Sequence, residues 1–385
     1  MIQAQAPMNK LYIGIMSGTS VDAIDVVAIE IEDKHFSFVG GINFELPNHL
    51  RTKILEITRK KEEQDSKIIV ELDNELGFEY ANAVNRLLRT YKIKKGKVAA
   101  IGLHGQTIAH HPNAKVPRSI QIGDAKLVAQ KTEIICVADF RSADINAGGQ
   151  GAPLAPVFHS WLFRIPNKNR AIINIGGISN ISILDENPLR GHDLGPGNIL
   201  LDSWIQSHEK EKYDHQGLWA RQGNTNENLL DIFLEDDFFS IAPPKSTGAD
   251  YFNLDWIETN LNIFKQNIAP QDVQSTLTEV TARIISDCLN AYTNIAEAAI
   301  CGGGSENTYL VERIMKLYKG KIFRTDDWGL KSKWVEASGF AYLAYLRLKN
   351  QDLELSGVTG LSLIHISEPT RRTPISYAVF CLKKK

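Results

Sequence analysis

The sequence predicts an α/β protein with two domains. Apolar runs of strand length alternate with stretches that carry apolar residues at helical spacing, which is the pattern of α/β layers. Two similar hairpin segments, at residues 11–31 and 170–184, suggest two related halves. The chain has 385 residues, and a single hydrophobic core stops growing before that length. We therefore expect two domains with a cleft between them.

Each hairpin consists of an apolar run, a glycine-containing bend and a second β-rich run. Residues 11–16 are apolar, the bend Ser17-Gly18-Thr19-Ser20 follows, and residues 21–31 continue as strand with Asp22 and Asp25 set into it. In the second copy the bend is Gly176-Gly177. Glycine permits the backbone conformations that tight bends require, so both segments are predicted to be strand, turn, strand.

Further elements follow the hairpins in order. Apolar residues at helical spacing predict helices over 69–88, 277–296 and 307–318, and short apolar runs predict buried strands over 98–103 and 298–301. Residues 104–156 are dense in Gly, Pro, Asp and His, and we expect this stretch to be rich in loops.

Composition excludes several classes of protein. Lys+Arg number 43 against Asp+Glu 45, a net charge of −2, so no broad basic field for nucleic acid is present. Cys 4 in so long a chain argues against a disulfide scaffold. No apolar run is long enough to span a bilayer, and the first ten residues do not resemble a signal peptide. The expected compartment is the cytoplasm, with no nucleic-acid or membrane partner.

Three glycine-rich segments, at 14–22, 174–180 and 301–307, are candidates to hold a polyphosphate. Such a ligand needs backbone N–H groups at close range, which side chains with a Cβ obstruct. The first segment adds carboxylates, and Asp22 is our candidate ligand for a hydrated Mg²⁺. An ordinary hairpin turn and a flexible linker are the alternatives for the first and third segments. Neither a Walker A sequence nor the dinucleotide pattern G-x-G-x-x-G is present.

The order of these segments resembles the phosphate-1, phosphate-2 and adenosine motifs of the actin, hexokinase and heat-shock chaperone ATPase superfamily. Within it, Gly14-Ile-Met-Ser-Gly-Thr-Ser-Val-Asp-Ala-Ile-Asp25 resembles the opening signature of anhydro-N-acetylmuramic acid kinases. The resemblance covers residues 11–360, and further motifs that resemble this family lie at 103–107, 121–124, 139–141, 149–154, 193–198, 243–248 and 336–337.

The resemblance implies a two-domain actin/hexokinase-like ATPase fold with a nucleotide and sugar cleft between the domains. We expect domains at 10–168 and 169–360, the last helix of the second being able to return to the first. The implied enzyme uses ATP and Mg²⁺ to open 1,6-anhydro-N-acetylmuramic acid with water and to phosphorylate O6. Its product would be N-acetylmuramate 6-phosphate, and its role would be in peptidoglycan recycling. A homodimer is left open.

Site residues follow from the motifs. The expected ATP-binding residues are Gly18, Thr19, Ser20, Val21, Asp22, Ala23, Ile24, Asp25, Gly176, Gly177, Gly303, Gly304 and Asn307. The expected sugar-binding residues are His104, Gln106, Thr107, Asp124, Asp139, Arg141 and Glu336. Hydrogen-bonding side chains suit sugar hydroxyls and an acetamide, and an arginine can pair with the lactyl carboxylate.

Asp193 is the candidate catalytic base, because the matching aspartate of the family is taken to activate the attacking water. The alternative is that Asp193 only caps the helix expected near Asn198. Glu336 could instead be a solvated surface residue, and Lys245 could approach a phosphate or be solvated. His104, His110 and His111 could suggest zinc, but a convincing third or fourth ligand is missing, so a loop role is preferred.

The chain departs from the family pattern at two places. Val21-Asp22-Ala23 stands where the signature usually has Leu-Asp-Gly, which puts the fine geometry of that loop in doubt because alanine disfavours positive φ. Residues 361–385 resemble a translated sequencing adapter, so we expect a non-native tail after Gly360.

Two other classes of function stay open. An actin-like or chaperone-like ATPase would keep all three glycine segments but would not require Asp193 or the polar cluster from His104 to Arg141. A protein that binds the sugar and only senses ATP would keep that cluster without catalysis. In the kinase, closure of the two halves around both ligands is expected to keep ATP from reacting with bulk water.

Overall fold

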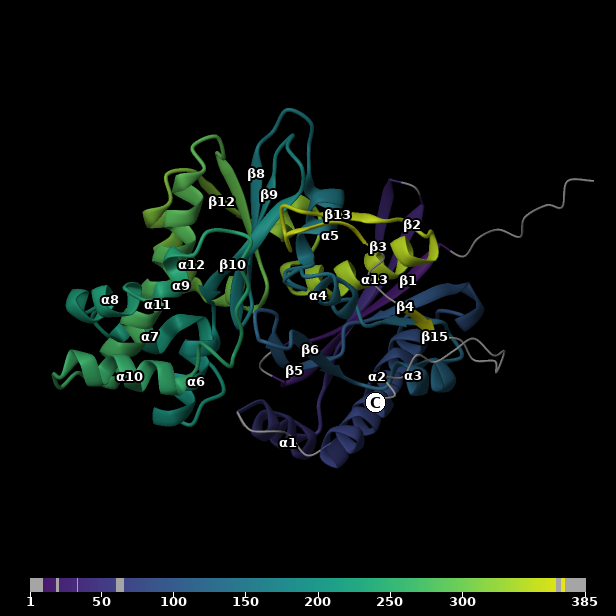
Figure 1. Ribbon diagram of the computed structural model, residues 1–385, viewed down its shortest axis with the longest axis horizontal. Helices are drawn as coiled ribbons and strands as arrows, with labels where there is room; N and C mark the ends of the chain where they lie inside the picture. Colours follow the sequence, from purple (N-terminus) through teal and green to yellow (C-terminus); the bar gives the residue numbers. More distant parts are fainter. Residues whose placement is uncertain (1–9, 19–20, 33, 60–65, 365–367, 371–385) are drawn as a thin grey trace, which may run out of the picture.

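The structure is a computed structural model that describes residues 10–18, 21–32, 34–59, 66–364 and 368–370. Thr19, Ser20 and residues 371–385 lie outside this described part. Its strands form two large sheets (Figure 1). The first sheet has the order β15-β7-β4-β1-β2-β3, from β1 (Leu11–Ser17), β2 (Ala23–Glu32), β3 (His35–Glu45), β4 (Val98–Leu103), β7 (Cys136–Ala138) and β15 (Glu368–Thr370).

The second sheet repeats the plan of the first. Its order is β10-β9-β8-β11-β12, from β8 (Arg170–Ile175), β9 (Ile178–Leu184), β10 (Arg190–Pro196), β11 (Glu297–Cys301) and β12 (Lys321–Arg324). In both sheets the first strand pairs antiparallel with a hairpin partner on one side and parallel with a later strand on the other. The prediction of an α/β protein with two related halves is confirmed.

Two small hairpins complete the strands of the described part: β5 (Gln106–His111) with β6 (Arg118–Ile122), and β13 (Leu353–Leu355) with β14 (Leu361–Ile364). The helices are α1 (Asn48–Arg59), α2 (Ser66–Thr90), α3 (Ala125–Thr132), α4 (Ser142–Asn146), α5 (Ala155–Phe163), α6 (Ile199–His208), α7 (Leu218–Gln222), α8 (Glu227–Leu234), α9 (Asp237–Ser240), α10 (Leu254–Phe264), α11 (Pro270–Ala291), α12 (Thr308–Leu317) and α13 (Val335–Leu348). None of these described helices is long and apolar enough to cross a bilayer.

The last helix, α13, returns to the first half of the chain. It packs on β1, β4 and β2, and α5, which covers β9 of the second sheet, packs against it. One hydrophobic cluster therefore runs from Tyr12 and Ala100 of the first sheet through Ala341 of α13 to Ile172 of the second sheet. Figure 1 shows α5 and α13 between the two sheets. The exact domain boundaries stay a prediction.

Close approach of α13 to the first sheet depends on two glycines. A Cβ atom at Gly14 of β1 would overlap the carbonyl oxygen of Ala337, and one at Gly102 of β4 would overlap the carbonyl oxygen of Phe340. Both conflicts are with backbone, which cannot rotate away as a side chain can. Glycine at these two strand positions is thus what allows the helix backbone to lie directly on the sheet.

Most predicted elements are confirmed, with two corrections. Residues 104–156 are not mainly loop, since they hold β5, β6, α3, β7, α4 and the start of α5. These elements are so short that neither periodicity repeats often enough to be recognised. The helix predicted over 277–296 runs over Pro270–Ala291 instead. Its first turns bury polar residues such as Gln274, Ser275 and Thr276, so they carry no apolar stripe.

The segment after Gly360 pairs with the rest of the chain where it is described. β14 pairs antiparallel with β13, and β15 pairs antiparallel with β7 at the edge of the first sheet. The sequence shows no sustained strand pattern there, and these two short strands are a difference from that expectation. The adapter-like origin of residues 361–385 stays a prediction.

The glycine contact makes a test of the fold possible. Gly102→Ala should lower the free energy of unfolding by about 1–3 kcal/mol, because the new methyl group forces α13 away from β4. The measurement is urea denaturation. Gly96→Ala is the control, since a Cβ there meets no atom within 4 Å. Equal stability of the two variants would contradict the close packing described above.

Candidate active site

The candidate residues gather at one edge of both sheets. β1, β4 and β7 run parallel, and Gly18, His104 and Asp139 follow their carboxyl ends. In the second sheet, Gly176 follows β8 and Gly302 follows the parallel strand β11. Ligands of open α/β sheets bind at the carboxyl ends of the strands. The topology therefore supports a shared site for all of these segments.

Asp193 lies on β10 and is buried, with 5% of its surface exposed. Its backbone N–H donates to the Lys245 carbonyl at 3.1 Å, and its Oδ2 accepts from the Thr247 N–H at 3.0 Å. The ladder between β10 and β9 shifts register just after Asp193, and such bulges re-aim side chains. Asp193 does not cap α6, which begins at Ile199 after Asn198.

The electrostatic setting of Asp193 suits a base that works near neutral pH. Burial raises the pKa of Asp193 to about 7, although the bond from Thr247 and the charges of Arg141 and Lys245 act to lower it. An ordinary aspartate would be a much weaker base, with a pKa of 3.8. A general base is most effective when its pKa lies close to the operating pH.

Arg141 hydrogen-bonds to His104, and its charge acts on Asp193. Its guanidinium donates to His104 Nε2 at 2.9 Å and to the Gly151 carbonyl at 3.3 Å. Burial and the charge of Arg141 hold the pKa of His104 well below its usual range, so the ring is neutral and Nε2 accepts. The nearby charges of Asp193 and Glu336 favour the charged guanidinium. Gln106 is also buried, and its Oε1 has no hydrogen-bond partner within the described part of the chain.

Glu336 joins this group from the first turn of α13. Its Oε1 accepts from Asn174 Nδ2 of β8 at 3.1 Å, so it is not a solvated surface residue. Burial raises the pKa of Glu336, the charge of Asp25 raises it further, and the charge of Arg141 lowers it. Residues from β2, β8, β10, α13 and the segment before α4 therefore act on one another through three carboxyl groups, one amide and one guanidinium.

The first glycine segment forms a tight turn, and the Val21 N–H donates to the Gly18 carbonyl at 3.2 Å. The side chains of Val21 and Ile24 are buried in the core, so only their backbone can face a nucleotide. The doubt about Ala23 is not realised, because its φ is not positive. It is Val21 that has a positive φ, of 53°, which is costly for a β-branched residue.

Asp22 is exposed, and its charge acts on the pKa of Asp202 of α6. Burial raises the pKa of Asp202 to about 7, and the charges of Asp22 and Asp214 raise it further. Sequence reasoning missed Asp202, whose signal was an acidic residue in the first turn of the helix after Asn198. Mg²⁺ usually takes one or two carboxylates and keeps several waters, so this pair fits it.

No group of three or more His, Cys, Asp or Glu that could hold a metal occurs in the described residues, which leaves the zinc alternative unsupported.

The second and third glycine segments lie side by side. The Gly176 carbonyl accepts from the Asn198 N–H, and the Gly177 carbonyl accepts from the Ile199 N–H. These hydrogen bonds hold the bend between β8 and β9 against the start of α6. Cys301 pairs with Asn174 in the parallel ladder, which brings Gly303 and Gly304 next to this bend. Asn307 accepts from the Leu310 N–H at 3.0 Å and caps α12, as a strand-to-helix motif requires.

Two predicted sugar ligands accept hydrogen bonds from backbone N–H groups at the starts of helices. Asp124 Oδ1 accepts from the N–H groups of Lys126 and Leu127, and it is the cap of α3. Asp139, which is exposed and has a φ of 56°, accepts from the Ser142 N–H at the start of α4. Thr107, by contrast, accepts from Gln121 Nε2 at 3.2 Å within the β5–β6 hairpin. A helix cap is a sufficient structural reason for an aspartate, so sequence alone could not separate these cases.

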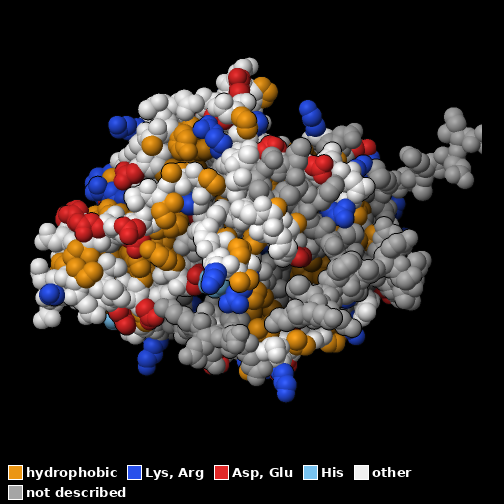
Figure 2. Space-filling view, in the orientation of Figure 1, with side chains coloured by type: hydrophobic (Ala, Val, Ile, Leu, Met, Phe, Trp, Pro, Cys, Tyr) orange, Lys and Arg blue, Asp and Glu red, His pale blue; other side chains and the backbone are white. Residues whose placement is uncertain are grey.

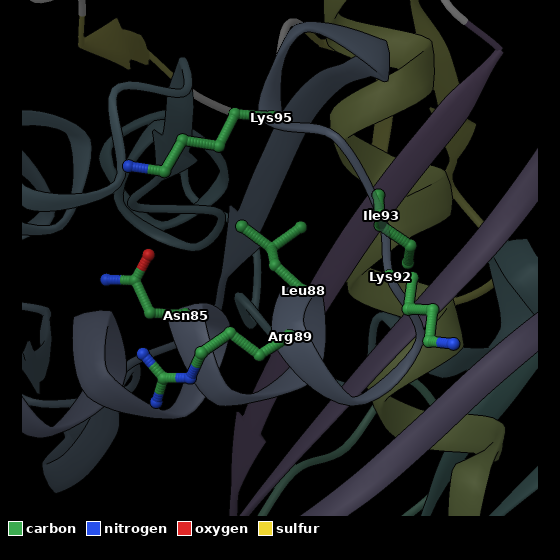
Figure 3. Close-up of a pocket in the computed structure, with 6 residues that line it drawn as sticks. All are labelled: Asn85, Leu88, Arg89, Lys92, Ile93 and Lys95. Carbon is green, nitrogen blue, oxygen red and sulfur yellow. The ribbon is translucent and has the colours of Figure 1, made fainter.

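A hollow at the end of α2 is a separate feature. Figure 3 shows it lined by Asn85, Leu88, Arg89, Lys92, Ile93 and Lys95. These residues precede β4, whereas His104 follows it, so the hollow lies at the opposite end of that strand. On the described part of the face in Figure 2, basic and acidic side chains are interspersed.

Comparison with known proteins identifies the family of this chain. A sequence profile of the anhydro-N-acetylmuramic acid kinases matches residues 10–366. An anhydro-N-acetylmuramic acid kinase from Saccharophagus degradans is 43% identical over 91% of this chain and 96% of its own length. One from Pasteurella multocida is 41% identical over 91% of this chain and 93% of its own.

Among solved structures, a ROK family glucokinase from Streptomyces griseus in complex with glucose and AMPPNP has a TM-score of 0.39 at 14% identity. That match covers 86% of this chain and 98% of the glucokinase. On the profile match and the two kinase sequences, the chain belongs to the anhydro-N-acetylmuramic acid kinase family.

Proposed function

We propose that this protein is an ATP-dependent anhydro-N-acetylmuramic acid kinase. It opens 1,6-anhydro-N-acetylmuramic acid with water and phosphorylates O6 to give N-acetylmuramate 6-phosphate, a reaction of peptidoglycan recycling and amino-sugar catabolism. The observation that carries this proposal is the buried carboxyl group of Asp193, which the Thr247 N–H holds in place and whose pKa of about 7 suits a general base.

Asp193 acts on the attacking water. Its carboxylate takes one proton as the water oxygen bonds to C1, and the bond between C1 and O6 breaks. The freed O6 bonds to the γ-phosphorus of ATP, and ADP leaves. Because phosphorus captures O6, a second carboxylic acid is not needed to protonate it. The burial of Asp193 keeps bulk water from competing for the same proton.

The polar cluster around Asp193 would bind the sugar. The unpaired Gln106 Oε1 is an acceptor suited to a sugar hydroxyl or the acetamide N–H. Arg141 can pair with the lactyl carboxylate, and His104 orients its guanidinium. Glu336 and Thr107 are further candidates to bind the sugar. We retain Asp124 and Asp139 as weaker candidates because their carboxylates already serve helix starts.

ATP would lie along the three glycine segments. The backbone at 18–25 and at 176–177 faces the phosphates in this proposal, and Gly303, Gly304 and Asn307 face the adenosine. Mg²⁺ near Asp22 and Asp202 would neutralise charge on the β- and γ-phosphates. An assembly ATPase would have no need of the buried group formed by Asp193, Arg141 and Glu336, and this group favours the kinase. The cytoplasm and a homodimer remain our expectations for the cell.

The reaction can be followed with labelled water. Incubation of the protein with 1,6-anhydro-N-acetylmuramic acid and ATP in ¹⁸O water should place the label at C1 and phosphate on O6, measured by mass spectrometry of the product. An experiment without ATP is the control. Phosphorylated sugar without ¹⁸O at C1 would contradict the coupled hydrolysis.

Asp193→Asn tests the base. The amide cannot accept the proton, so sugar-dependent ADP release should fall by about 10²–10⁴-fold. ATP affinity should stay unchanged, because no glycine segment is altered. Asp231→Asn, on α8, is a matched control. Release of ADP by Asp193→Asn at the wild-type rate would show that the base is another group.

The pH dependence of kcat/KM tests the setting of Asp193. Only the ionised carboxylate accepts a proton, and burial raises its pKa to about 7. Activity should therefore rise with pH through a limb centred near 7, in measurements of ADP release from pH 5 to 9. Activity that stays constant from pH 5 to 9 would mean that the base keeps a pKa near the ordinary aspartate value of 3.8, and would contradict the burial of Asp193 in the working enzyme.

A further inference from the structure

The loop at residues 243–248 provides both backbone contacts of Asp193. The Lys245 carbonyl accepts from the Asp193 N–H, and the Thr247 N–H donates to its carboxylate. The position of this loop therefore decides whether the carboxylate keeps a hydrogen-bond donor. Two side chains of the loop, Lys245 and Ser246, anchor it on opposite sides.

Lys245 anchors the loop to its own half of the molecule. Its Nζ donates to the Phe238 carbonyl at 2.9 Å and the Phe239 carbonyl at 3.4 Å, and lies 4.5 Å from the centroid of the Phe238 ring. Only 8% of the residue is exposed. Lys245 is therefore not solvated, and it holds the turn at α9.

Ser246 anchors the loop to the first half of the chain. Its hydroxyl donates to Gln150 Oε1 at 3.0 Å and lies 3.3 Å from Nε2 of His110 on β5. A second contact joins the same two regions, because His111 Nδ1 lies 3.3 Å from Asp250 Oδ2. The loop beside Asp193 is thus tied to the β5–β6 hairpin and to the segment after α4.

The direction of these hydrogen bonds can be assigned. Burial lowers the pKa of His110 to about 3, so its ring is neutral and carries one N–H. Ser246 uses its single hydrogen on Gln150, so it must accept from His110 Nε2–H. Nδ1 then accepts from the Ser119 hydroxyl at 3.0 Å.

The same chain reaches the sugar-binding region. Ser119 accepts from Gln121 Nε2 at 2.7 Å, and this amide also donates to Thr107 Oγ1 at 3.2 Å. Every hydroxyl and ring nitrogen in this sequence has one consistent role. A hydrogen-bond relay, defined here as Thr107, Gln121, Ser119, His110 and Ser246, therefore links the predicted sugar loop with the loop that holds Asp193.

We infer that Ser246 is a positioning residue for the base, and that the relay couples the β5–β6 hairpin to the placement of Asp193. The inference rests on the proposed role of Asp193. Loss of the Ser246 hydroxyl removes both hydrogen bonds that this residue makes with the first half, so the Thr247 N–H next to it is held less firmly. The carboxylate then loses both a donor and its orientation toward the water.

Ser246→Ala is the test, with Ser240→Ala as the matched control. The Ser240 hydroxyl donates to the Asp237 carbonyl at 2.8 Å, at the exposed end of α9. We expect Ser246→Ala to lower kcat about tenfold and to move the acidic limb of kcat/KM to higher pH, since the lost N–H bond had lowered the pKa of Asp193. Ser246→Thr should restore both values, and Ser240→Ala should change neither. A fall in kcat with an unmoved limb would overturn the inference.

A second measurement does not depend on activity. ¹³C NMR of the aspartate carboxyl groups in the ligand-free protein, with Asp193→Asn to assign the signal, gives the titration of Asp193 directly. A shift to higher pH in Ser246→Ala supports the inference even if the wild type forms no phosphorylated sugar, a result that would refute the proposed function alone. If Ser246→Ala does not fold, Gln150→Leu removes one of the two hydrogen bonds of the Ser246 hydroxyl and should shift the titration in the same direction. An unchanged titration in the folded variant would overturn the inference.

Discussion

The packing of α13 on β1 and β4 is the contact on which the rest of the structure depends. Gly14 and Gly102 let two backbones touch, and this fixes where the helix begins. Glu336, in its first turn, can therefore reach Asn174 of the other sheet. Phe340, one turn further, lies under the His104 ring, with 4.6 Å between the ring centroids. A single helix thus supplies both a wall and a carboxylate of the site.

Charge balance is the second constraint. The charges of Asp193 and Glu336 both act on a single guanidinium, that of Arg141. The neighbouring His104 is neutral. Burial makes ionisation of both carboxyl groups costly, so the site holds a weakly basic carboxylate at neutral pH instead of a fixed ion pair. Water exclusion and basicity therefore have the same origin, the packing of the two halves against each other.

The sequence predicted the hairpins, the main helices and the family because glycine bends and long apolar patterns are local signals. It did not predict the bulge after Asp193, because a register shift depends on the partner strand. The burial of Glu336 depends on Asn174, more than a hundred residues away in the chain. Asp202 and Ser246 escaped notice for the same reason: an acidic residue in a helix and a serine in a loop are ordinary until their neighbours are known.

The position of α13 in the chain has a consequence for synthesis. β1 leaves the ribosome long before the helix that covers it, which spans Val335–Leu348. Until those residues emerge, one face of β1 and β4 has no permanent partner. The amino-terminal half therefore cannot finish folding ahead of the carboxyl-terminal half. The apolar face of β1 and β4 stays uncovered in the nascent chain until α13 has been synthesised.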